Sequence, residues 1–214
     1  MAHSLILGMS ESGKTTLARY LAAYYKKHGM GVIVLDPMRD PEWVCDFITA
    51  DQEEFLEVFW ASQSCMAFLD EGAESVGRYD KAMRKTATQG RHWGHCCHFI
   101  TQHGTDLAPV VRGQCRHLFL FQSSRQQGEV LAKEYNQPEL LTCTDLKQGE
   151  YLHFSRFGIL KRCRVILKRG NANDSAPCDR RSGNNNVRVT GGCAREKIPH
   201  ENDGDPADGS TEKG

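Results

Sequence analysis

The sequence has no excess charge of either sign, since 27 Lys and Arg balance 27 Asp and Glu among its 214 residues. A neutral chain is not a general binder of polyanions, so any contact with nucleic acid must come from a local cluster of positive charge. A long apolar run is also missing. The apolar stretch at the N-terminus leads directly into a glycine motif and is too short for a signal sequence or a membrane span.

A disulfide framework is not expected either. The nine cysteines are an odd number, and several fall within predicted strands and helices, where a free thiol packs as a small apolar group. Together with the missing signal sequence, this predicts a reduced, cytoplasmic protein. The cysteines within predicted elements are Cys65, Cys96, Cys97, Cys115 and Cys163.

Large apolar residues become scarce after about Gly170, where Asn, Gly, Asp, Ser and Pro dominate. Such a segment cannot bury enough surface to offset its ordering entropy. We therefore predict one folded domain over residues 1–169 and a disordered polar tail over residues 170–214. No internal repeat is visible.

Apolar runs alternate with helical patterns through the rest of the chain. This alternation predicts an α/β fold in three layers, with a mostly parallel central sheet and right-handed crossovers. The last two strands could add an antiparallel edge. The expected strands are 3–7, 32–35, 65–69, 97–101, 117–121, 151–154 and 160–167, and the expected helices are 14–28, 51–62, 79–90 and 125–135.

The glycine-rich segment at residues 8–15 fits the phosphate-loop pattern G-x-x-x-x-G-K-[ST] at every defined position. It lies between a strand and a helix, where curled backbone N–H groups and the positive helix end can hold phosphate oxygens. Lys14 would reach the β- and γ-phosphates of ATP, and Thr15 would hold Mg²⁺. The alternative is an ordinary helix start, which the pattern and its context disfavour. The predicted nucleotide-binding residues are Gly8, Ser10, Glu11, Ser12, Gly13, Lys14, Thr15 and Thr16.

Two carboxylates, Asp70 and Glu71, follow the buried strand 65–69 in the manner of a Walker B strand. A buried parallel strand delivers its last residues to the sheet edge where ligands of open α/β sheets bind. Asp70 would support the Mg²⁺ shell, and Glu71 would polarise the attacking water as a general base. A strand followed by solvated acids is the alternative, and the upstream phosphate loop makes the functional interpretation the better one.

Polar residues end two further strands. Gln102 follows Phe-Ile-Thr and could sense the γ-phosphate or orient the water, a role that the motif supports only in company with the others. Asp36 ends the strand 32–35, where it either faces the nucleotide site or simply terminates the strand before Pro37.

A basic stretch lies between the acidic pair and the Gln102 strand, opposed only by Glu74 and Asp80. Phosphate contacts with DNA need such clustering. One arginine could instead reach the γ-phosphate of a neighbouring subunit, with Arg84 and Arg91 as first choices. A solvated amphipathic helix is the default interpretation for any single residue. The cluster comprises Arg78, Lys81, Arg84, Lys85 and Arg91.

Histidines and cysteines crowd between residues 92 and 98 and raise the question of zinc. Adjacent Cys96 and Cys97 on a strand point to opposite faces, and no second C-x-x-C or H-x-x-x-H pair completes a tetrahedral set. We expect core cysteines beside a polar loop, and no structural zinc.

The order of these motifs resembles the FtsK–HerA superfamily of DNA-pumping P-loop ATPases, which have a RecA/ASCE-like fold. Within it, the chain looks like the genome-packaging ATPases of tailless, tectivirus- or corticovirus-like double-stranded DNA viruses. The resemblance covers residues 4–167. It rests on Gly-Met-Ser-Glu-Ser-Gly-Lys-Thr-Thr, Val-Leu-Asp-Pro, Phe-Leu-Asp-Glu, and Arg-His-x-Gly ahead of Ile-Thr-Gln.

The resemblance implies an ATPase that packages double-stranded DNA into a preformed capsid. It implies ATP and Mg²⁺ as cofactors, a homo-oligomeric ring, commonly a hexamer, and a capsid-vertex or membrane protein as recruiting partner. The expected places are the host cytoplasm and the packaging vertex. With no domain visible ahead of the phosphate loop, we expect DNA contacts on the core itself.

Three alternatives remain. A small-molecule kinase fits the short chain but not Glu71, which favours hydrolysis. A protein that uses ATP only for virion assembly or docking is a second. A GTP switch is the poorest, because no Asn-Lys-x-Asp motif occurs.

Overall fold

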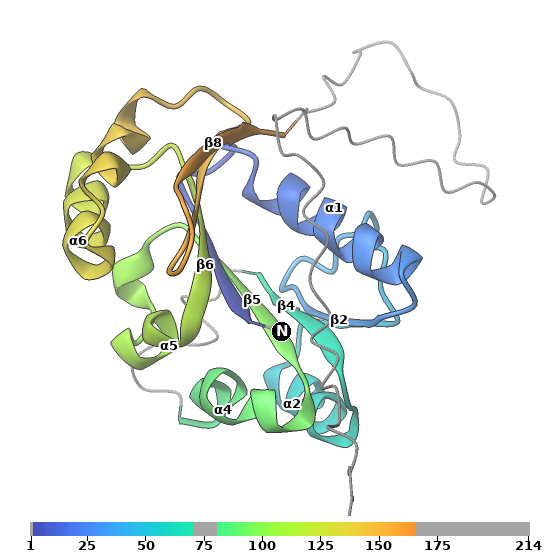
Figure 1. Cartoon of the computed structure of the whole chain (residues 1–214). Helices are drawn as coiled ribbons and strands as arrows, with labels where there is room; N and C mark the ends of the chain where they lie inside the picture. Colours follow the sequence, from blue (N-terminus) through green and yellow to red (C-terminus); the bar gives the residue numbers. More distant parts are fainter. Residues whose placement is uncertain (1, 71–80, 166–214) are drawn as a thin grey trace, which may run out of the picture.

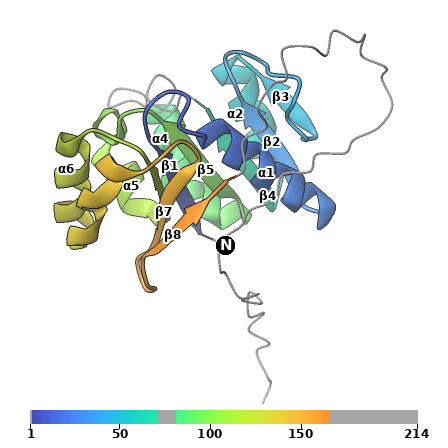
Figure 2. The ribbon, with the colours of Figure 1, turned by 90° about the horizontal axis from the view of Figure 1, so that it is seen from above.

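A single eight-stranded sheet forms the centre of the computed structural model, which describes residues 2–70 and 81–165. Its spatial order is β3-β2-β4-β5-β1-β6-β7-β8 (Figures 1 and 2). The strands are β1 His3–Leu7, β2 Gly31–Leu35, β3 Phe47–Thr49, β4 Cys65–Leu69, β5 Cys96–Thr101, β6 Cys115–Phe121, β7 Glu150–Ser155 and β8 Lys161–Arg164.

The six strands from β3 to β6 are parallel, and β7 and β8 are antiparallel to their neighbours. This confirms the predicted parallel sheet with an antiparallel edge. Strand β5 lies between β1 and β4, so residues after three neighbouring strands end at one edge of the sheet. That arrangement is the expected P-loop NTPase fold.

Helices cover the two faces unequally (Figures 1 and 2). Helix α1, Lys14–Lys27, packs through Leu17, Ala18 and Ala22 against the apolar residues of one face. The other face carries the remaining helices, whose buried residues join a second apolar cluster. These helices are α2 Gln52–Ala61, α4 Lys81–Gln89, α5 Pro109–Gln114 and α6 Arg125–Tyr135. The chain therefore forms three layers, as predicted.

Five local features differ from the sequence expectations. Strand β3 and helix α5 were not predicted, because three and six residues are too few to show a periodic pattern. Two short 3₁₀ segments, at Gly90–Trp93 and Gly104–Asp106, and a longer one at Pro138–Asp145 were not predicted either. The expected start of a helix at residue 79 and the tail 170–214 lie outside the described residues. Within the described part, no helix has the length and apolar character needed to cross a membrane.

Candidate functional site

The phosphate loop connects β1 to α1 and curls through three residues of positive φ, at Gly8 (+158°), Glu11 (+59°) and Gly13 (+113°). Glycine is required at Gly8 for a second reason. A Cβ there would lie 2.5 Å from the Cβ of Phe121, far inside normal contact. The backbone of the loop therefore has a shape that glycine permits at Gly8 and Gly13 and that other residues would oppose there.

The start of helix α1, directly after the phosphate loop, has no side-chain cap. Helices α2 and α6 begin with side-chain caps, since Asp51 accepts from the amide of Glu54 and Ser124 from that of Gln127. Helix α1 begins instead after Gly13, which has no side chain to serve as a cap. A helix start of this kind is suited to bind an anion through its backbone N–H groups and its dipole.

The phosphate loop and the end of β4 lie close together, and the contact is between two residues for which the sequence predicted a shared role, Thr15 and Asp70. The hydroxyl of Thr15 donates to Oδ2 of Asp70 at 3.4 Å, across 55 residues of sequence. The ammonium of Lys14 donates to the carbonyl of Met9 at 2.7 Å, so it lies folded over the loop. Hydroxyl and carboxylate oxygens are the ligands that Mg²⁺ prefers, and the pair fits a cation that also takes phosphate and water oxygens.

Gln102, which follows β5, reaches the same loop. The hydroxyl of Ser10 donates to Oε1 of Gln102 at 3.2 Å. Because β5 lies between β1 and β4, the side chain enters the site between the phosphate loop and Asp70. This is where a residue that senses the γ-phosphate would have to lie.

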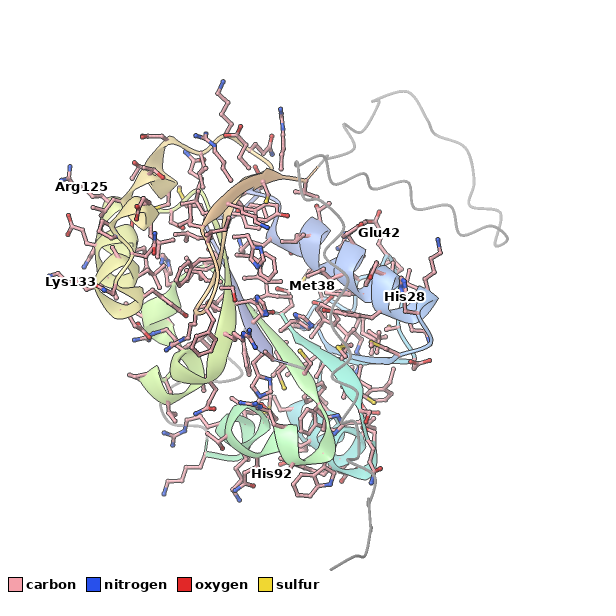
Figure 3. All side chains as sticks on the ribbon, in the orientation of Figure 1. His28, Met38, Glu42, His92, Arg125 and Lys133 are labelled. Atoms are coloured by element: carbon pink, nitrogen blue, oxygen red, sulfur yellow. The ribbon has the colours of Figure 1, made fainter. Side chains whose placement is uncertain are left out.

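These residues line an open cleft of about 290 Å³. It extends from the phosphate loop toward the segment after β2, which carries Met38 and Glu42 (Figure 3). On that side Arg19 of α1 forms ion pairs with Asp40 and Glu42. The lining residues are Ser10, Glu11, Lys14, Thr15, Arg19, Asp36, Met38, Asp40, Asp70, Thr101 and Gln102.

Asp36 combines the two roles that the sequence left open. It lines the cleft, and its buried carboxylate accepts hydrogen bonds from the amides of Met38 (2.9 Å) and Asp40 (3.0 Å) and from the indole of Trp43 (3.0 Å). Three donors from the following segment converge on one carboxylate, so Asp36 fixes that wall of the cleft.

A second support of the phosphate loop comes from the turn before β7, which the sequence did not reveal. Nε2 of Gln148 donates to the carbonyl of Glu11 at 3.0 Å, and the amide of Gly149 donates to the carbonyl of Ser12 at 2.9 Å. A trans peptide group points its C=O and N–H in opposite directions. Holding the Ser12 carbonyl outward therefore directs the N–H of Gly13 to the other side of the loop.

The predicted arginines lie apart from this cleft. Arg84 is half-buried on α4, and Arg91 is exposed in the 3₁₀ segment Gly90–Trp93, before β5 starts. Neither is among the described residues that line the cleft. His92, next to Arg91, lies at the end of the sheet opposite to the start of α1 (Figure 3). If either arginine contacts a γ-phosphate, that phosphate is therefore expected in a neighbouring copy.

Several predicted residues lie outside the described residues. They are Glu71, the expected general base, and Glu74, Arg78 and Asp80 of the charged stretch.

The histidines and cysteines of the 92–98 region belong to the core, except for His92, which is exposed. His95 accepts from the amide of Cys65 at 3.1 Å and bonds the carbonyl of Phe59 at 2.9 Å. His98 bonds Ser4 at 2.5 Å and stacks on Phe68. Burial lowers the pKa of His98 to about 3 and raises that of Cys96 to about 11, so both are neutral. Among the described residues, no three His, Cys, Asp or Glu side chains are grouped to hold a metal by themselves.

Solved structures with the same fold include nucleotide-dependent proteins. The genome packaging NTPase B204 from Sulfolobus turreted icosahedral virus 2, in complex with AMPPCP, matches with a TM-score of 0.64 and 18% identity, over 75% of this chain and 96% of that chain. VirB4 of Thermoanaerobacter pseudethanolicus matches with a TM-score of 0.56 and 12% identity, over 78% and 89%.

The cytoplasmic domain of the type VII secretion ATPase EccC of Thermomonospora curvata gives a TM-score of 0.57 and 14% identity, over 76% of this chain and 23% of that chain. Models of known protein families and curated protein sequences give no match. At these identities the likeness shows the fold alone, and on the fold it bears out the resemblance noted in the sequence.

Proposed function

We propose that this chain, which shares the fold of a genome packaging NTPase, is an ATP-hydrolysing motor that moves double-stranded DNA into a preformed viral capsid. The observation that carries the proposal is the meeting of Thr15, Asp70 and Gln102 around one phosphate loop. These three residues follow three different strands, β1, β4 and β5, and together they supply side chains of the kinds that ATP hydrolysis needs.

The residues of the cleft divide the work on ATP. The amides at the start of α1 and the ammonium of Lys14 would hold the β- and γ-phosphates. Thr15 and Asp70 would hold Mg²⁺, which neutralises charge on the phosphates when bound. Gln102 would orient the attacking water or sense the γ-phosphate, and Glu71 is the proposed general base.

The DNA contacts are assigned to the basic surface of α4 and the 3₁₀ segment after it. From Lys81 to Thr105 the sequence contains no Asp or Glu, whereas Lys81, Lys85 and Arg91 are exposed. In a chain of zero net charge this is a local excess of positive charge, which is what phosphate contacts require. Binding of duplex DNA is therefore expected to weaken steeply as salt rises.

A ring of identical subunits, six by analogy with related motors, would surround the DNA in the host cytoplasm. At the packaging vertex it would be held by a capsid or membrane protein. The proposal supposes that hydrolysis occurs between neighbouring copies, with Arg84 or Arg91 reaching the γ-phosphate next door.

Steady-state hydrolysis of ATP, measured with and without duplex DNA, tests the proposal. We expect turnover that rises with DNA, that is lost in Lys14→Ala together with nucleotide binding, and that is lost in Glu71→Gln with binding retained. Lys133→Ala on α6 serves as the control for Lys14→Ala, because it removes an exposed lysine away from the cleft.

Each alternative gives a different result. Phosphate transfer to a nucleoside or sugar, without hydrolysis that responds to DNA, would identify a kinase. If the Lys14→Ala protein failed to attach to the particle, the chain would be an assembly or docking protein; a motor variant attaches and fails to package. Undiminished hydrolysis by Glu71→Gln would remove that residue from the role of base.

A further inference from the structure

The two outer edges of the sheet carry opposite charge. At one edge, the strand β8 reads Lys-Arg-Cys-Arg over residues 161–164, and exposed Arg116 of β6 adds a further cation nearby. Within β7 and β8 the one acid is Glu150, which is paired with Arg162 at 2.7 Å. We call the surface formed by Arg116, Lys161, Arg162 and Arg164 the basic edge.

The opposite edge is acidic. Seven acids and no Lys or Arg occur between Asp40 and Leu69, a stretch that includes β3 and α2. Some are matched within the chain, since Glu42 pairs with Arg19 and Asp46 with Lys26. We call the outward surface of α2, with Asp51, Glu53 and Glu57, the acidic edge; all three side chains are exposed.

One pair of charges on the acidic edge is unfavourable to the isolated chain. Glu53 and Glu57 are four residues apart on one face of α2, and like charges at this spacing destabilise a helix. A surface that supplied cations would relieve this repulsion.

Exposed apolar side chains accompany both edges. Phe157 is 83% exposed and Ile159 is 74% exposed in the turn that joins β7 to β8, and Arg116 lies over the Phe157 ring at 5.1 Å. In the segment before β3, Met38 is 80% exposed and Val44 is 38% exposed. Protein interfaces combine such apolar groups and arginine with complementary charge.

We propose that the basic edge of one copy docks onto the acidic edge of the next copy of this chain. The inference rests on the proposed function, which requires a ring. The two edges lie at opposite ends of the sheet (Figure 2). A twofold dimer through either edge would place like charges together. Charge complementarity therefore favours a head-to-tail contact between copies, and such contacts form a closed ring when the rotation between copies allows it.

The contact also adjoins the nucleotide cleft. Met38 and Asp40 line that cleft and belong to the same segment as Val44, between β2 and β3. A neighbour docked at this end of the sheet adjoins that wall of the cleft, so we expect assembly to respond to bound nucleotide.

Charged residues on an edge strand also prevent unwanted strand pairing. Charge reversal distinguishes this role from docking. A glutamate on an edge strand also prevents strand pairing, whereas docking onto an acidic surface requires a positive charge. The first variant is Lys161→Glu with Arg164→Glu, and the second is Glu53→Lys with Glu57→Lys. Each alone is expected to weaken association about tenfold or more, read as mass by sedimentation with a non-hydrolysable ATP analogue present.

Complementation is the decisive measurement. An equimolar mixture of the two variants should assemble again, because each altered edge meets its altered counterpart and the native edges meet each other. A chain carrying all four changes should assemble with itself. The matched control is Arg125→Glu with Lys133→Glu, which reverses two exposed cations on α6 (Figure 3) and should leave assembly unchanged.

The proposal is overturned by a wild-type chain that binds nucleotide but stays monomeric with nucleotide and duplex DNA, or by variants that do not complement. Loss of duplex binding by the Lys161→Glu, Arg164→Glu chain at unchanged mass would show instead that the basic edge binds DNA. Nucleotide affinity is measured in parallel. Its absence in the wild type would refute the proposed function, whereas its presence in monomeric variants shows that they fold.

Discussion

Gln148→Met tests whether the turn before β7 positions the phosphate loop for nucleotide. Methionine matches glutamine in length and is neutral, but it cannot donate to the carbonyl of Glu11, which Gln148 reaches at 3.0 Å. The bond joins residues 137 positions apart, so only the folded chain makes it. The amide bond from Gly149 to Ser12 remains in the variant and keeps the loop partly in place.

The size of the effect follows from the worth of one exposed hydrogen bond. A net contribution of about 1 kcal/mol corresponds to a roughly fivefold weaker affinity for nucleotide. Because the bond orients the loop before nucleotide arrives, KM should rise by the same factor while kcat changes little. Gln148 is exposed, so the thermal midpoint should stay close to the wild-type value.

The assay is the dissociation constant of a fluorescent, non-hydrolysable ATP analogue, with KM and kcat measured beside it. Gln148→Arg restores a donor and should recover most of the affinity. Gln137→Met is the control, because Gln137 donates to Glu139 on the surface near α6, away from the cleft. Equal affinity in Gln148→Met and the wild type, or an equal loss in the control, would refute the positioning role.

Three other changes test separate parts of the structure. Burial lowers the pKa of His98 to about 3 in the folded chain. Below about pH 6.5 the unfolded chain therefore binds a proton at this residue and the folded chain does not, so the free energy of unfolding falls as the pH falls. At pH 5 this amounts to about 2 kcal/mol, and His98→Gln should reduce the difference in unfolding free energy between pH 7 and pH 5 by that amount. Asp36→Ala leaves three donors without their acceptor, among them the Trp43 indole, and should lower the unfolding free energy by about 3 kcal/mol in urea titrations. If Arg84 or Arg91 contacts the γ-phosphate of a neighbouring copy, its replacement by Ala should lower kcat about a thousandfold at unchanged nucleotide affinity. Wild-type turnover in both Arg84→Ala and Arg91→Ala would exclude this role for the two arginines.

The sequence predicted the elements that local patterns encode. The limits of β1 and α6 agree with the expected ranges, and α1 ends one residue earlier than expected. Apolar runs identify buried strands because both faces of a parallel strand are covered. Strand β3 was not predicted, because Phe47–Thr49 is short and only partly buried and therefore forms no apolar run.

The sequence by itself also determined the phosphate loop. Its glycines, Lys14 and Thr15 are neighbours in the chain, so the positive φ of Gly13 and the start of α1 follow from local steric and helix-start preferences. The meeting of Thr15 with Asp70 could be inferred as well, because parallel strands end at a common edge of the sheet.

The tertiary structure alone decided which distant side chains support this loop. The insertion of β5 between β1 and β4 brings Gln102 to Ser10, and the antiparallel return of β7 brings Gln148 to Glu11. It also placed the acidic α2 and the basic β8 at opposite edges of one sheet. Strand order and surface position depend on packing between segments far apart in the chain, and no local pattern encodes them.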